Sequence, residues 1–136
     1  MSHHISAMLD VHPQAAEISG KPQLAECIDA CFQCAQICTS CADACLAEDM
    51  VAALASCIRT DLDCADICIA TGTVLIRQTA SSPAINRALL EACRASCSVC
   101  AEDCERHAGM HEHCRICAAA CRRCEQACAD LLAAWA

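Results

Sequence analysis

CIDACFQCAQICTSCADAC, residues 27–45, places a cysteine at six positions that are alternately four and three residues apart. This spacing puts one side chain per turn on a single face of an α-helix, as positions a and d of a heptad do. In an ordinary helical core that face holds leucine and isoleucine, whereas here it holds only thiols. The stretch therefore predicts a helix whose buried face consists of cysteine, and the rest of the chain is expected to enclose that face.

Three further segments repeat the pattern, so every long helix that we expect presents cysteines on one face. One or two helical cysteines are commonly small apolar core residues, but eighteen in phase indicate a lining with a chemical role. The candidate metal ligands are Cys27, Cys31, Cys34, Cys38, Cys41, Cys45, Cys57, Cys64, Cys68, Cys93, Cys97, Cys100, Cys104, Cys114, Cys117, Cys121, Cys124 and Cys128.

The breaks in this pattern predict an all-α fold. The alanine-rich segments favour helices, and Pro22 and Pro83 suit the first turn of a helix. The predicted helices cover residues 22–47, 50–78, 83–107 and 111–134. With short connections they form an antiparallel up-down-up-down four-helix bundle over residues 21–136. Residues 1–20 are expected to be an N-terminal extension with enough apolar side chains for a short helix.

Composition and charge exclude several classes of protein. A chain of 136 residues suits one domain, and a formal net charge of −8 disfavours nucleic acid, because no basic face is available to neutralise phosphates. No apolar run approaches the roughly 18 residues of a membrane helix. The segment MSHHISAMLDVHPQ lacks the basic and apolar regions of a signal peptide. We therefore expect a cytoplasmic protein without a membrane partner, and in that reducing compartment clustered cysteines more often bind metal than form disulfides.

The inward residues form layers of four if the two helical hairpins are in register. The predicted layers are Cys41–Cys57–Cys104–Cys117, Cys38–Asp61–Cys100–Cys121, Cys34–Cys64–Cys97–Cys124 and Cys31–Cys68–Cys93–Cys128. Asp61 stands where a cysteine would continue the pattern. It has three interpretations: a polar lining group, a weak relay for incoming ions, or a side chain turned outward to solvent.

The two ends of the predicted bundle differ in chemistry. One end gathers Met50, His107, His111 and His113 beside the thiols, which predicts an entrance that offers thioether and imidazole ligands. The alternative interpretations are a core-end methionine and solvated turn histidines. The opposite end gathers leucines and Trp135, which predicts an apolar plug.

Three more histidines, His3, His4 and His12, lie in the extension. An N-terminal X-X-His arrangement that uses His3 or His4 would bind Cu(II) through backbone nitrogens. The alternative is a solvated tail.

Charge balance indicates which metal suits a lining of thiols. Helical neighbours three or four residues apart have Cβ atoms about 5–6 Å from each other, so two thiolates can share one ion and each can bridge to the next. A tetrahedral Zn²⁺ site of four cysteines keeps a local charge of −2, and a stack of such sites is costly in a low-dielectric core. Cu(I) prefers soft thiolate ligands, and one Cu(I) for each thiol proton leaves the core neutral. The pattern therefore predicts multiple Cu(I) ions per chain.

This arrangement resembles the bacterial cytosolic copper storage proteins over about residues 22–134. The runs that support the resemblance are CxxxCxxCxxxCxxCxxxC at 27–45, CxxxCxxCxxxC at 93–104 and CxxCxxxCxxCxxxC at 114–128. The resemblance implies a homotetramer of four-helix bundles that stores many Cu(I) ions and is not an enzyme. It also implies inward cysteines at all eighteen positions and a histidine-bearing entrance at His107, His111 and His113, while Asp61 departs from a purely thiol interior.

Two alternative functions remain open at this point. One is a structural or redox metalloprotein with Zn²⁺ or an iron–sulfur cluster, although the ferredoxin run C-x₂-C-x₂-C-x₃-C-P does not occur. The other is a thiol redox buffer that cycles through disulfides. For copper storage, Cu(I) is expected to arrive on a chaperone or a small thiol.

Overall fold

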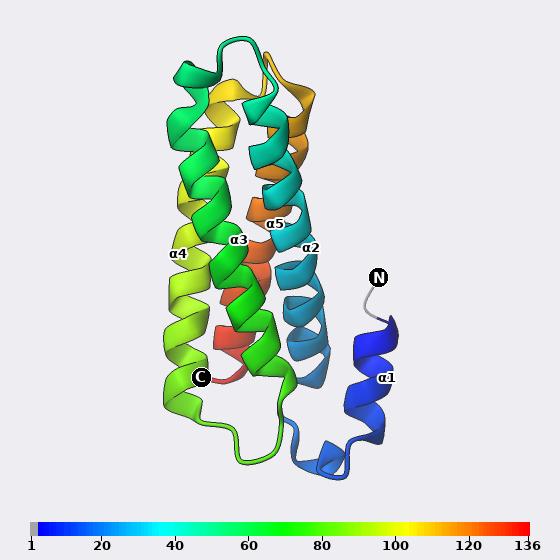
Figure 1. Ribbon diagram of the computed structural model, residues 1–136. Coiled ribbons are helices and arrows are strands. Elements are labelled where there is room, and N and C mark those ends of the chain that lie inside the picture. The colour runs from blue at the N-terminus through cyan, green and yellow to red at the C-terminus, as the bar shows by residue number, and fades with distance from the viewer. Residues whose placement is uncertain (1–2) are drawn as a thin grey trace.

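The computed structural model describes residues 3–136, and these fold into an antiparallel bundle of four long helices (Figure 1). The long helices are α2 (Lys21–Leu46), α3 (Ala55–Ile76), α4 (Pro83–His107) and α5 (Glu112–Ala134). The shorter elements are the helix α1 (His3–Val11) and the 3₁₀ turns η1 (Ala15–Glu17) and η2 (Val51–Leu54). Each long helix packs against two neighbours, in the cyclic order α2, α3, α4, α5. The all-α, up-down-up-down prediction is confirmed.

The second long helix is shorter than the predicted range of 50–78. Residues 51–54 form the 3₁₀ turn η2, which brings Leu54 into the core with 0% exposure. At the other end Arg77 is extended, and the side-chain amide of Gln78 donates a hydrogen bond of 2.7 Å to the carbonyl of Leu75. Both ends are therefore set by turn geometry and by a side-chain cap, which helical periodicity does not predict.

The first turns of α2 and α4 follow from local sequence. Ser82 caps α4 by accepting a hydrogen bond from the backbone N–H of Ile85, and Pro83 occupies the first helical position. Gly20, which precedes α2, has a φ of +63°, a left-handed conformation that glycine adopts at little cost. A Cβ at Gly20 would also lie 3.2 Å from the Cβ of Ala134. The start of α2 is therefore pressed against the end of α5.

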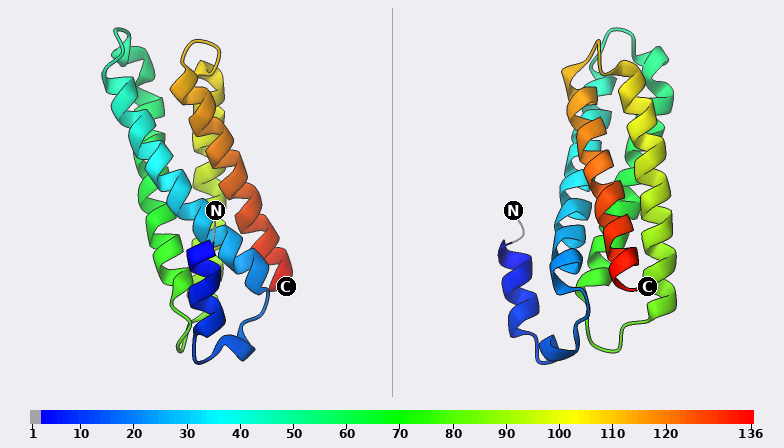
Figure 2. Two further views of the ribbon diagram at one scale, coloured as in Figure 1. Left: turned by 90° about the vertical axis from the view of Figure 1, so that its right-hand side faces the viewer. Right: turned by 180° about the vertical axis from the view of Figure 1, so that it is seen from behind.

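The extension places α1 along the outside of the bundle beside α2 (Figure 2). Ile5 and Leu9 on α1 are 3% and 2% exposed, so the short helix shares the hydrophobic core. The suggested Cu(II) arrangement at His3 or His4 involves residues 1–2, which lie outside the described residues.

Two buried carboxylates join the hairpins α2–α3 and α4–α5 to each other. Asp29 on α2 accepts hydrogen bonds of 3.0 Å from Arg123 on α5 and from Gln33. On the opposite side, Asp103 on α4 accepts hydrogen bonds of 3.0 Å from the hydroxyls of Ser56 and Thr60 on α3. Hydrogen bonds to a charged acceptor are stronger than neutral ones, so these two contacts help fix the register between the hairpins.

Candidate metal site

All eighteen cysteines are free thiols that point into the bundle. Cys41 is 2% exposed and the other seventeen are 0% exposed. The four-three spacing explains this placement, because it keeps each sulfur on the face that the other helices cover. The inward lining that the sequence predicts is therefore present on all four long helices.

The sulfur atoms form a continuous column along the bundle axis. Neighbouring Sγ atoms lie 3.6–4.0 Å apart, from the Cys27–Cys128 pair near the closed end to the Cys57–Cys104 pair near the other. A metal–sulfur bond of about 2.3 Å, as in zinc thiolates, allows two sulfurs about 3.8–4.6 Å apart to share an ion. The column therefore has the spacing of bridged metal–thiolate sites without any movement of the backbone.

Groups of four ligand atoms lie within 4.8 Å of one another at successive levels of the column. They include Cys31–Cys93–Cys124–Cys128, Cys34–Cys68–Cys97–Cys124, Cys34–Cys38–Cys64–Cys121 and Cys38–Cys100–Cys117–Cys121. These groups share members, and most combine residues from two neighbouring predicted layers. Three of these groups hold three residues of one predicted layer and one residue of the next, so the predicted layers are present but staggered along the bundle axis.

Asp61 lies inside this column with 0% exposure, so the outward-facing interpretation is wrong. Its Oδ1 accepts hydrogen bonds from the thiols of Cys100, Cys117 and Cys104 at 3.0, 3.2 and 3.5 Å. Its Oδ2 is buried and has no hydrogen-bond partner among the described residues. Burial, reinforced by the sulfurs of Cys117 and Cys100, raises the pKa of Asp61 to about 12. The side chain is therefore a neutral carboxylic acid at neutral pH.

His113 connects the column to the turn between α4 and α5. Its Nδ1 lies 3.4 Å from the Sγ of Cys41 and 3.7 Å from the Sγ of Cys114. His113, Cys41, Cys45 and Cys114 form a further group whose ligand atoms lie within 4.8 Å of one another. One nitrogen and three sulfurs therefore converge where the column meets the surface.

Glu48 holds both entrance histidines, and the sequence alone gave no reason to select it. Its Oε2 lies 2.9 Å from Nε2 of His113 and 3.1 Å from Nδ1 of His111. The two imidazole rings are stacked with centroids 5.4 Å apart, and Nε2 of His111 is buried with no hydrogen-bond partner within residues 3–136. The only sequence signal is an acidic pair, Glu48 and Asp49, in the turn opposite the histidines.

The charges at this end favour retention of a cation. The hydrogen bond from His113 lowers the pKa of Glu48, so its carboxylate is ionised. Burial lowers the pKa of His113, but hydrogen bonds to Cys41 and Glu48 outweigh it, and the net direction is upward. Burial raises the pKa of the Cys45 and Cys114 thiols. Without metal, the Cys45 and Cys114 thiols are therefore neutral beside an ionised carboxylate, whereas hydrogen bonds from Cys104 and Cys117 lower the pKa of Cys41.

His107 and Met50 lie at the same end but outside the contacts described above. His107 is half-buried, and its carbonyl accepts a hydrogen bond of 3.0 Å from the backbone N–H of His111. Met50 is 41% exposed in the turn before η2. Their role as metal ligands stays a prediction.

The opposite end of the column is closed by leucines. Leu24, Leu75, Leu90 and Leu131, one from each long helix, are no more than 1% exposed. Trp135 is half-buried and packs against this cluster. The apolar plug that the sequence predicts is therefore present, and the column has polar ligands at one end only.

A four-helix bundle lined with free thiols defines a class of cysteine-lined metal-binding proteins. The family model of copper storage proteins (Csp) matches residues 20–133, so this chain belongs to the copper storage protein family. No helix described over residues 3–136 combines the length and the apolar character needed to cross a membrane.

Solved structures of a Streptomyces lividans protein are similar to this chain. The copper storage protein Ccsp, loaded with ten copper equivalents, is 52% identical with a TM-score of 0.93, over 96% of this chain and 98% of that one. A five-copper form, described as a cytosolic copper storage protein, is 59% identical with a TM-score of 0.81, over 82% and 93% of the two chains. None of the curated protein sequences matches the chain.

Replacement of Asp61 by asparagine should stabilise the reduced, metal-free protein at neutral pH. The folded carboxyl keeps its proton up to a pKa of about 12, whereas an unfolded one, near 3.8, releases it. Asp61 therefore lowers the free energy of unfolding as pH rises from 5 to 8, by at most about 1.4 kcal/mol per pH unit.

Asp61→Asn should remove this slope in anaerobic urea unfolding. The exposed neighbour serves as control: Asp63→Asn should keep it. Parallel pH profiles for wild type and Asp61→Asn would contradict the assignment.

Proposed function

We propose that this protein stores Cu(I) as many thiolate-bound ions inside the bundle and catalyses no reaction. The observation that supports this most directly is the column of buried sulfurs along the bundle axis, in which pairs of Sγ atoms from different helices lie 3.6–4.0 Å apart. A single structural metal site needs only four ligands. A column of overlapping four-ligand groups instead offers bridging positions for many ions.

Charge favours a monovalent ion as the cargo. Each Cu(I) that binds displaces a thiol proton, so the charge of the interior is the same before and after loading. Zn²⁺ bound by four thiolates would leave a net charge of −2 at each level of the core. Among the described residues, no cationic side chain is buried there to compensate for that charge. The copper-loaded structures of the Streptomyces lividans protein also support copper as the bound metal.

Copper enters, in this proposal, at the end that holds Glu48 and the stacked histidines. Cu(I) arrives on a chaperone or a small thiol, and the imidazole of His113 binds it beside Cys41. The ion then passes inward by ligand exchange. Because each step replaces one sulfur by a similar one, the steps are nearly isoenergetic. The neutral carboxyl of Asp61 lies next to Cys117, where it lends an oxygen to the ion during transfer.

The protein acts in the cytoplasm and assembles into a homo-oligomer, a tetramer by family resemblance. An apolar strip on α3 supports assembly: Leu62, Ile69 and Ile76 are 45%, 48% and 37% exposed and share one helical face. Exposed apolar side chains that line up in this way are typical of protein interfaces.

Anaerobic titration of the reduced protein with Cu(I) against a competing chelator should saturate near one ion per cysteine, or eighteen per chain. A pH-stat in the same experiment should record one proton released per ion. Cys64→Ser combined with Cys97→Ser should lower the capacity by about two ions. The exposed Ser40→Ala serves as control and should not change it.

Saturation at a few equivalents would contradict storage. Preferential saturation by Zn²⁺ at a much lower capacity, with more than one proton released per ion, would favour the zinc alternative. Loss of free thiols on mild oxidation, fully reversed on reduction, would favour the redox buffer.

His113→Ala should slow the initial loading of copper by roughly tenfold. This is the lower end of the effect on metal affinity or activity when a group that orients a metal ligand is removed. The final capacity should fall by no more than one ion, because the column beyond the entrance is intact. Stopped-flow mixing with a Cu(I)–chelator complex measures the rate. His4→Ala on the exposed face of α1 is the control, and equal rates for both variants would place the entrance elsewhere.

Leu62→Glu together with Ile69→Glu should dissociate the oligomer, since each puts a charge into the apolar strip. Sedimentation equilibrium measures the mass. Ile116→Glu changes an equally exposed isoleucine on α5, the helix diagonal to α3, and should leave the mass unchanged. A monomeric wild type, or dissociation by both sets of variants, would contradict the interface.

A further inference from the structure

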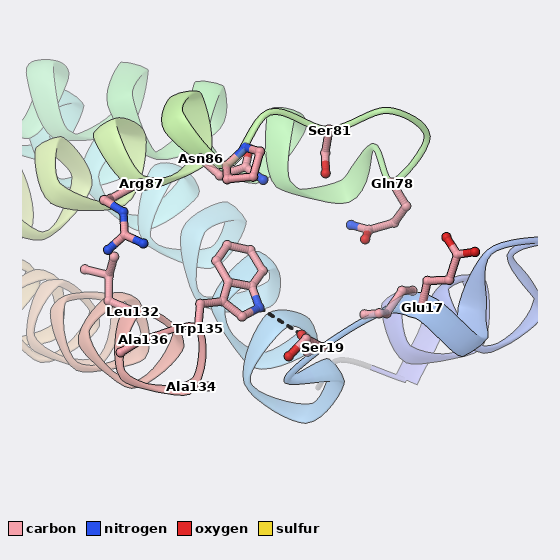
Figure 3. Close-up of a pocket in the computed structure, with 12 residues that line it drawn as sticks. Glu17, Ser19, Gln78, Ser81, Asn86, Arg87, Leu132, Ala134, Trp135 and Ala136 are labelled. Atoms are coloured by element: carbon pink, nitrogen blue, oxygen red, sulfur yellow. Dashed lines mark hydrogen bonds between the residues drawn. The ribbon is translucent and has the colours of Figure 1, made fainter.

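A cavity lies at the closed end of the bundle (Figure 3). Its volume is about 430 Å³, within the range of small-molecule pockets, about 300–1,000 Å³. It is walled by the segment that follows η1, by the first turn of α4 and by the end of α5. None of its lining residues is a cysteine or a histidine, so it is chemically separate from the metal column.

Asn86, in the first turn of α4, has an unpaired hydrogen-bond acceptor at the wall of the cavity. The residue is 7% exposed, and its Oδ1 is buried without a hydrogen-bond partner in the described part of the chain. Asn86 and Trp135 both line the cavity (Figure 3). A buried, unpaired carboxamide oxygen costs free energy. A ligand that presents an N–H group at this position would remove that cost.

The neighbouring groups on α4 favour an anionic group on the same ligand. Arg87 forms no ion pair with any residue over the described range, and its guanidinium lies at the edge of the cavity beside Leu132 (Figure 3). The hydroxyl of Ser81 lies across the cavity, just before the N-terminus of α4. A helix N-terminus adds a partial positive charge. A carboxylate fits this side of the cavity.

The remaining walls offer an apolar surface and a second charge. The indole N–H of Trp135 donates a hydrogen bond of 2.8 Å to the carbonyl of Ser19, which holds the ring in place. Trp135 and Leu132 together give an apolar wall. Glu17 lies on the far side of the cavity from Arg87 (Figure 3) and forms no ion pair within the described residues. An ammonium group fits there.

We propose that this cavity binds a short free peptide with a C-terminal apolar residue. The carboxylate of the peptide pairs with Arg87, a backbone N–H donates to Oδ1 of Asn86, and the ammonium group faces Glu17. The apolar side chain packs on Trp135. A peptide meets these requirements together because it joins an acid, an amide N–H and an amine in one small molecule. The proposal does not depend on copper binding.

The fluorescence of Trp135 tests this directly, because the chain has one tryptophan and no tyrosine. The reduced full-length protein is titrated with Gly-Gly-Leu, with its C-terminal amide and with its N-acetyl form. We expect a saturable change with Gly-Gly-Leu and at least tenfold weaker binding of the amide. The acetylated form should also bind more weakly.

No change with Gly-Gly-Leu, or equal binding of the amide, would overturn the proposal. Equal binding of the acetylated form would overturn a free peptide and indicate the tail of a larger chain.

Variants assign the effect to the cavity. Arg87→Gln changes an exposed side chain, so the protein should fold, and it should weaken binding of Gly-Gly-Leu at least tenfold. Asn86→Ala should weaken it as well; circular dichroism verifies its fold, and Arg87→Gln decides the outcome alone if Asn86→Ala is unfolded. The control Arg94→Gln, on the same helix outside the cavity, should bind normally. Unchanged binding by Arg87→Gln would overturn the assignment. The Cu(I) capacity of Arg87→Gln, expected to equal that of wild type, separates this result from the storage function.

Discussion

The contact between sulfur atoms across four helices is the constraint on which the structure depends. Eighteen thiols share one interior, and the Sγ pairs that lie 3.6–4.0 Å apart pack in this way only while they are neutral or bridged by metal. The same constraint explains why the one carboxyl in the column, Asp61, is held in its neutral form by burial. It also explains where the charged groups lie: the carboxylates that link the hairpins, Asp29 and Asp103, face outward from the column toward arginine and hydroxyl groups.

The column has a direction because its two ends are closed by different chemistry. Four leucines exclude water and ions beneath the Cys27–Cys128 pair. At the other end, two imidazoles lie beyond the last sulfurs, and the carboxylate of Glu48 contacts both imidazoles. The available ligand atoms therefore change from sulfur to nitrogen and then to oxygen toward the surface. In the proposed function, an incoming Cu(I) therefore meets progressively softer ligands as it moves inward, which favours capture and inward transfer over binding at the rim.

The sequence predicted most of the fold and of the sulfur column because both follow from one repeating spacing of the cysteines, alternately four and three residues. The four-three spacing alone places all eighteen sulfurs inward, and Pro83 and Ser82 mark the start of α4. It did not predict the stagger of the layers, the 3₁₀ turn before Leu54 or the role of Glu48. These features depend on how one turn faces another, and no periodic signal in a single helix contains that information. Met50, selected for its softness as a ligand, lies half-exposed in that same turn.

A core built of cysteine and alanine also explains the shortage of aromatic residues. Helices brought close enough for sulfur contacts leave little room for large rings, and the only phenylalanine lies half-buried at the flank of the column. There its ring approaches Gly72 so closely that a Cβ on that residue would lie 3.0 Å from it. The bundle is therefore held by many small contacts, the leucine plug and the two linking carboxylates, none of which involves metal. Because loading replaces protons on sulfurs that are already in position, the protein fills with copper without having to fold around it, unlike small zinc domains whose folding depends on the ion.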